Sequence, residues 1–238
     1  IRDRRITSQG GLVDMRIRFD EQLKQLNKEM INMGTMIEKS IGDAVKALMK
    51  QDVELAQKVM AGDEEIDRTE RKIEDLCLRL LLQQQPVARD LRNISAALKM
   101  VTDMERIGDQ ATDIAEILNT GSVHVPVTAI PLQEMADYAM HMVNDSVTAY
   151  VEEKSDLAKK VISSDDILDN LFNKVRNALD QNTMDFSSDE VLDLLMISKY
   201  YERIGDHATN IGEWAEFSVD GIHRNGDSIS DLFNPDSL

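Results

Sequence analysis

Acidic side chains repeated at helical spacing are the feature of this sequence that could do chemistry. The phrase ERIGDQATDIAE, residues 105–116, returns 97 positions later as ERIGDHATNIGE, residues 202–213, with nine of twelve positions identical. On an α-helix, residues four apart lie on one face, so each copy presents a ladder of polar side chains. The first ladder comprises Glu105, Asp109 and Asp113, and the second comprises Glu202, Asp206 and Asn210.

Two helices that present carboxylates to each other suit a bound cation. Neighbouring acids on one helix face repel each other by a few tenths of a kcal/mol per pair, and oxygen-liganded metal ions offset that repulsion. Further acids with the same spacing precede each copy of the phrase: Asp63 and Asp67 in the first, Asp165 and Asp169 in the second. We therefore predict metal binding by the acids of the phrase, with these four aspartates as additional ligands.

Other interpretations of the acidic ladders stay open. A solvated helical face needs no metal, and Arg106 and Arg203 lie where they could neutralise some of the acids. His207 follows Asp206 directly and therefore points about 100° away from the ladder, which makes it a less favoured ligand. The exact repetition of the carboxylates favours the cation over the solvated face.

A glycine stands inside both copies of the phrase. Glycine in a helix interior costs about 1 kcal/mol relative to alanine, yet Gly108 and Gly205 occupy matched positions. We expect these glycines to permit the close approach of another backbone or of a ligand.

The repetition extends well beyond the phrase. Residues 45–67 align with residues 147–169 at an offset of 102. The sequence therefore divides into two copies of one unit, residues 15–119 and 131–222, joined by a linker over residues 120–130. A polar acidic tail, residues 223–238, follows. Residues 1–14 have no apolar core of a signal peptide, and we expect them to be added or upstream sequence, with Met15 as the native start.

Each unit is predicted to form three long helices. In the first unit, apolar residues recur at helical spacing through Leu23, Leu26, Met30, Met33, Ile37, Ile41, Val45 and Leu48. Asp52 is expected to cap a second helix that runs to about Gln84, and Pro86 to lie in the first turn of a third. Ser187 and Glu190 form a predicted capping box in the second unit. Short connections make consecutive helices antiparallel, so the predicted fold is all-α: two tandem three-helix bundles, six long antiparallel helices in total.

The composition narrows the classes of function. The formal net charge is −17, which argues against nucleic acid as a partner, because phosphate contacts need clustered Lys and Arg. No segment approaches the roughly 18 consecutive apolar residues of a spanning helix. The one cysteine, Cys77, stands among leucines and is expected to be a buried apolar side chain of a protein in a reducing cytosol.

The absence of catalytic motifs predicts that the protein is not an enzyme. The sequence contains no P-loop, no G-x-S-x-G and no Cys–His arrangement. A carboxylate-bridged metalloenzyme of the helical-bundle type is the alternative, but such enzymes use Glu-x-x-His, which does not occur here. A plain phosphate receptor is disfavoured because acidic faces repel phosphate unless a metal intervenes.

With these motifs identified, the chain resembles the PhoU family of bacterial phosphate-signalling regulators. The resemblance covers Met15 to about Ile222. It rests on ERIGDQATDIAE and ERIGDHATNIGE, which fit the paired (E/D)-x-x-x-D signatures of that family, and on the tandem three-helix architecture.

The resemblance implies a function that spacing alone does not. Family members are cytoplasmic and bind the nucleotide-binding subunit of the phosphate ABC transporter, so they reach the membrane only through partners. They also contact a sensor histidine kinase and act as negative regulators of phosphate uptake and of phosphate-starvation genes. Dimers are common, so a homodimer is expected.

The resemblance also implies multinuclear iron or zinc clusters at the acidic signatures. By position, the ligands are Glu105, Asp109 and Asp113 in one bundle, and Glu202 and Asp206 in the other. This chain departs from a symmetric pattern at Asn210, the counterpart of Asp113. The second cluster is therefore expected to be weaker, smaller or absent.

Overall fold

The computed structural model describes residues 4–83, 86–120, 123, 130–181 and 185–221. All regular secondary structure within these residues is α-helical. The helices are α1 (Arg4–Lys50), α2 (Val53–Gln83), α3 (Ala88–Thr120), α4 (Leu132–Val151), α5 (Ser155–Ser163), α6 (Asp165–Gln181) and α7 (Ser188–Asp220).

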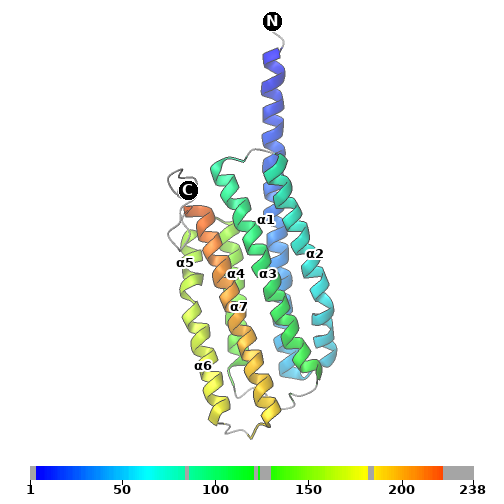
Figure 1. Ribbon diagram of the computed structural model, residues 1–238, viewed down its shortest axis with the longest axis vertical. Helices are drawn as coiled ribbons and strands as arrows, with labels where there is room; N and C mark the ends of the chain where they lie inside the picture. The colour runs from blue at the N-terminus through cyan, green and yellow to red at the C-terminus, as the bar shows by residue number, and fades with distance from the viewer. Residues whose placement is uncertain (1–3, 84–85, 121–122, 124–129, 182–184, 222–238) are drawn as a thin grey trace, which may run out of the picture.

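The helices form two bundles that lie side by side (Figure 1). The first bundle contains α1, α2 and α3, and the second contains α4, α7 and the collinear pair α5 and α6. Helix α3 packs against α7 and α1 packs against α4, so both units contribute to one continuous core. The predicted tandem pair of three-helix bundles is confirmed.

The first helix is longer than its core-facing stripe requires. It begins at Arg4, and its first turns extend beyond the ends of the neighbouring helices (Figure 1). Helical structure therefore reaches into the segment 1–14 that the sequence analysis left outside the fold. The apolar stripe from Leu26 to Leu48 is buried, with Leu23 partly buried against it.

The middle helix of the second unit is interrupted at Ser164, where a single turn residue separates α5 from α6. The hydroxyls of Ser163 and Ser164 both donate to the carbonyl of Lys160, at 2.9 and 2.8 Å. Such bonds from serine back to the preceding turn compete with the helical ladder and bend helices. The equivalent position in α2 is Gly62, and α2 is continuous.

The helix ends follow the capping residues with one correction. Asp52 accepts a hydrogen bond from the Leu55 amide at 3.0 Å, and Ser187 and Glu190 form the complete capping box of α7. Pro86, however, precedes the helix instead of lying in its first turn, because α3 begins at Ala88 and the Leu91 amide already donates to the carbonyl of Val87.

The third helix of each unit turns the apolar side of the acidic phrase into the core. Every member of the two stripes is buried: Met104, Ile107, Ala111, Ile114 and Leu118 on α3, and Tyr201, Ile204, Ala208, Ile211 and Ala215 on α7. The packing leaves the acidic side of the phrase facing the neighbouring helices and solvent. Cys77 is buried as expected, and burial raises the pKa of its thiol to about 12.

At both matched glycines the closely approaching group is a side chain of the middle helix. The sequence had predicted a backbone or a ligand at these positions. A Cβ at Gly108 would lie 3.0 Å from Cδ1 of Ile66 on α2. A Cβ at Gly205 would overlap Cδ2 of Leu168 on α6. Ile66 and Leu168 are themselves equivalent in the two units, so the glycines let the middle helix approach the third helix in the same way twice.

Candidate metal centre

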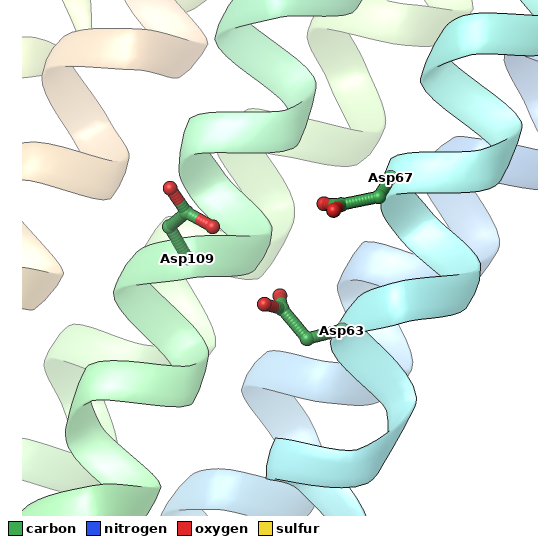
Figure 2. Close-up of side chains that lie close together, drawn as sticks. All are labelled: Asp63, Asp67 and Asp109. Atoms are coloured by element: carbon green, nitrogen blue, oxygen red, sulfur yellow. The ribbon is translucent and has the colours of Figure 1, made fainter.

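Three aspartates from two helices converge in the first bundle. Asp63 and Asp67 on α2 and Asp109 on α3 each offer a carboxylate oxygen, and these oxygens lie within 4.8 Å of one another. The side chains point from the two helices into the space between them (Figure 2). We call these three residues the aspartate trio. Among the described residues, no other group of three or more potential ligand side chains converges in this way.

Because the three carboxylates of the trio lie close together, their like charges disfavour the ionisation of all three at once. Burial raises the pKa of Asp109, and the nearby charges of Asp63 and Asp67 raise it further. Burial likewise raises the pKa of Asp63, against which the hydroxyl of Thr112, donating at 3.1 Å, favours the charged form. The guanidinium of Arg71 lies 3.9 Å from Asp67 on the exposed side. A cation between the carboxylates would remove most of this repulsion.

Glu105 places another carboxylate one turn of α3 away from Asp109. It lies outside the 4.8 Å group, but burial and the charges of Asp109, Glu70 and Asp67 raise its pKa to about 7. Glu70 on α2, which the sequence analysis did not select, also has a raised pKa, first because of burial and then because of other acids of α2. Acids on both α2 and α3 therefore lie close enough to raise one another's pKa beyond the aspartate trio.

Asp113, the third acid of the first ladder, points to a different partner. Its carboxylate accepts a hydrogen bond from the hydroxyl of Tyr200 on α7 and lies near the charge of Arg203. It is not among the oxygens that converge. The rise of about 1.5 Å per residue places the two ends of a ladder over i, i+4 and i+8 about 12 Å apart, too far to bind one ion.

The second bundle repeats the placement of the acids without the same convergence. Asp165 on α6 accepts a hydrogen bond from Thr209 at 3.3 Å, and Glu202 pairs with Lys199 on its own helix. Asp206 is exposed, yet partial burial and the charges of Glu202 and Asp165 raise its pKa to about 6. Asp169 is half-buried on α6. These four acids form no group within 4.8 Å in the described residues.

A buried carboxylate between the two bundles was missed by the sequence analysis. Asp103 on α3 is 7% exposed. One of its oxygens lies 2.8 Å from Nδ1 of His207 and accepts a hydrogen bond from the amide of Asn210 at 3.4 Å. Both partners lie on α7, so this cluster ties the bundles together and explains the placement of His207. The repeat offers a sequence signal for this contact, because Asp103 is equivalent to Tyr200 and Asn210 is equivalent to Asp113.

The donor set of the aspartate trio fits a divalent cation. Carboxylate oxygens are ligands for hard divalent ions at 2.0–2.6 Å, and they also bind iron and zinc. Oxygens that lie within 4.8 Å of one another need only small side-chain movements to bind one ion placed between them. Asp63, Asp67 and Asp109 would hold such an ion, with Glu105 and Glu70 beside it.

Fold and site together define a duplicated helical-bundle protein with a cluster of carboxylates between the second and third helices of its first unit. Comparison with known proteins agrees. The family model described as the PhoU domain matches twice, over residues 30–118 and residues 132–215. The chain belongs to the PhoU family.

The relatives cover the chain over most of its length. A phosphate-specific transport system accessory protein PhoU homolog of Clostridium acetobutylicum is 39% identical over 209 residues, which is 85% of this chain and 94% of that protein. A homolog of the same name from Aquifex aeolicus is 35% identical over 77% of this chain and 84% of its own length. These relatives are named as accessory proteins and not as enzymes, in agreement with the prediction.

Solved structures share the fold. The crystal structure of PhoU from Pseudomonas aeruginosa superposes with a TM-score of 0.78 at 32% identity, covering 85% of this chain and 99% of that one. The phosphate transport system regulatory protein PhoU from Streptococcus pneumoniae has a TM-score of 0.76 at 23% identity over 84% of this chain and 96% of its own length, which shows the fold alone. Among the described residues, no helix is long and apolar enough to cross a membrane.

Proposed function

We propose that this protein is a cytoplasmic negative regulator of phosphate uptake and of phosphate-starvation signalling. It acts as an adaptor between the nucleotide-binding subunit of a phosphate ABC transporter and a sensor histidine kinase. The observation that carries the proposal is the match of the PhoU domain to both units, residues 30–118 and 132–215. Relatives named as accessory proteins of phosphate-specific transport are matched over most of their length.

The adaptor role is tested by binding to both partners. The transporter's nucleotide-binding subunit and the sensor kinase, both from the same organism, are each titrated with the full chain at millimolar and at micromolar phosphate. Association is followed by interferometry or calorimetry. Binding to both partners that depends on phosphate or nucleotide supports the adaptor role. A chain that fails to bind either one of these two partners under all of these conditions would refute the adaptor role. The mass of the free chain, measured by light scattering, tests the homodimer at the same time.

The second part of the proposal is that the acids between α2 and α3 bind transition metal, as iron or zinc, in one or more ions. The convergence of Asp63, Asp67 and Asp109 within 4.8 Å supports a first ion in the first bundle. Glu105 and Glu70, whose charges interact with each other and with the trio, are further carboxylate ligands for additional ions. Protein purified without chelators and without a nickel column is expected to contain iron or zinc by elemental analysis.

A further inference from the structure

Both copies of the acidic phrase place a threonine hydroxyl on an aspartate of the neighbouring helix. Thr112 on α3 donates to Oδ1 of Asp63 on α2 at 3.1 Å. Thr209 on α7 donates to Oδ1 of Asp165 on α6 at 3.3 Å. The two threonines are equivalent in the repeat, and so are the two aspartates. The same interhelical contact therefore forms twice in surroundings that otherwise differ.

A threonine in a helix has a nearer acceptor than a side chain of another helix. Its hydroxyl ordinarily bonds to the carbonyl of the preceding turn, as Thr35 does to Ile31 at 3.0 Å and Thr69 to Glu65 at 2.8 Å. Thr112 and Thr209 donate across the helix interface instead. Since a hydroxyl has one proton to donate, these bonds are made in preference to the local one.

We propose that Thr112 is a positioning residue that orients the Asp63 carboxylate toward Asp67 and Asp109 for metal binding. Thr209 makes the matching contact with Asp165 in the second bundle, where the acids do not converge. The inference rests on the metal binding proposed above. Oδ1 of Asp63 accepts the hydroxyl proton, and a carboxylate keeps further lone pairs on both oxygens with which to bind an ion. Groups that hold a ligand from behind in this way change metal affinity by 10–100-fold when they are removed.

The contact also counters the repulsion that would turn Asp63 away. Without a donor, the burial of the side chain and, to a smaller extent, the charges of Asp67 and Glu116 disfavour an ionised Asp63 in its present position. The hydroxyl of Thr112 is a fixed dipole on the opposite helix, and it holds the carboxylate at the α2–α3 interface before any ion arrives. The site is thereby prepared for binding in the metal-free protein.

The test uses the full chain with four substitutions. Thr112→Val removes the hydroxyl at constant size, and Thr112→Ser keeps it. Thr209→Val is the matched change in the second bundle, and Thr35→Val controls for loss of a hydroxyl that bonds to its own helix. Zn²⁺ affinity is measured by calorimetry, and the side-chain χ1 of Asp63 is measured in the metal-free protein from three-bond NMR couplings.

The two measurements separate this inference from the metal proposal. We expect Thr112→Val to weaken Zn²⁺ binding by about 10-fold and to average the χ1 of Asp63, whereas Thr112→Ser and Thr35→Val keep the wild-type values. An unchanged χ1 and an unchanged affinity in Thr112→Val would overturn the positioning role. A wild-type chain that binds no Zn²⁺, Fe²⁺ or Mn²⁺ would instead refute the metal proposal, and χ1 alone would then decide whether Thr112 orients Asp63.

Discussion

Tyr200 on α7 donates its hydroxyl to the carboxylate of Asp113 on α3, and the equivalent positions make the reciprocal contact. Asp103 is the counterpart of Tyr200 and Asn210 is the counterpart of Asp113, and Asn210 donates to Asp103 at 3.4 Å. The two third helices therefore cross antiparallel about a local two-fold axis (Figure 1). Asn210, which looks like a lost metal ligand in the sequence, is a donor to a buried carboxylate of the other bundle.

We expect Tyr200→Phe to weaken the interface between the bundles. A hydrogen bond to a charged acceptor at a partly exposed position contributes about 1 kcal/mol, and the substitution leaves the ring in place. Urea unfolding should show a loss of that size. Tyr138→Phe, on α4, is the control, because it removes a tyrosine hydroxyl and leaves the contact between α3 and α7 intact. If Tyr200→Phe and Tyr138→Phe unfold at the same urea concentration as the wild type, the contact does not hold the bundles together.

Replacing a helical glycine by alanine should raise the stability of the protein at Gly62 and lower it at Gly205. Alanine in a helix interior is about 1 kcal/mol more favourable than glycine, and at Gly62 nothing lies within 4 Å of the added Cβ, so Gly62→Ala should stabilise. At Gly205 the methyl group meets Leu168, and overpacking costs about 1–3 kcal/mol. We expect thermal unfolding to give the order Gly62→Ala above wild type and Gly205→Ala below it.

Gly108→Ala should fall between these two, because Ile66 lies 3.0 Å from the added Cβ and can shift by a few tenths of an ångström. Combining Gly205→Ala with Leu168→Ala removes the overlapping branch and tests the cause. If the loss in Gly205→Ala does not depend on residue 168, so that the two changes add, the close approach is not what the glycine is for.

The sequence predicts those parts of the fold that depend on periodicity within one helix. The stripe through Met30, Ile37 and Ile41 reports the buried side of α1 directly, because burial repeats every 3.6 residues. The caps at Asp52 and Ser187 are equally local. The break at Ser164 was missed because its counterpart in α2 is continuous, and the choice between helix and side-chain bonding at Ser163 and Ser164 is made by two hydroxyls.

Contacts across helices could be predicted only in part. That α2 and α3 face each other with acids follows from the spacing of Asp63 and Asp67 against Asp109. Which acid of the ladder joins them depends on the rotation and height of one helix relative to the other, and these depend on interhelical packing such as the close approach of Ile66 to Gly108. The sequence pattern treats Glu105, Asp109 and Asp113 alike, although the structure gives each a different set of neighbours.

Stability of the metal-free protein should fall as pH rises through the titration of Glu105. The pKa of Glu105 is about 7 in the folded protein, above its ordinary value of 4.5, so the folded state binds more protons than the unfolded state between these values. The free energy of unfolding therefore decreases with pH in this window and is level on either side of it. Asp206, with a pKa of about 6 against 3.8, contributes in the same direction.

Glu105→Gln removes the larger of these contributions. In the presence of EDTA, we expect this variant to be more stable than wild type at pH 7.5 and equal to it near pH 4.5, as measured by urea unfolding. Glu116→Gln, at an exposed position on the same helix, is the matched control and should follow the wild-type pH dependence more closely. A wild-type stability that increases from pH 5 to pH 7 would contradict the raised pKa of Glu105.

Matched double substitutions should show that the two units bind metal unequally. Asp67→Asn with Asp109→Asn removes two members of the aspartate trio, and Asp169→Asn with Asp206→Asn makes the equivalent change where the acids do not converge. Metal content by elemental analysis should fall in the first variant by more than in the second. Because ligating carboxylates must be deprotonated, bound metal should also dissociate as the pH is lowered from 7 to 5. Removing the metal from wild type at neutral pH should lower its melting temperature, since the carboxylates are then left facing one another. Equal metal content in the two variants, with unchanged melting temperatures, would mean that the acidic phrase is a solvated helical face.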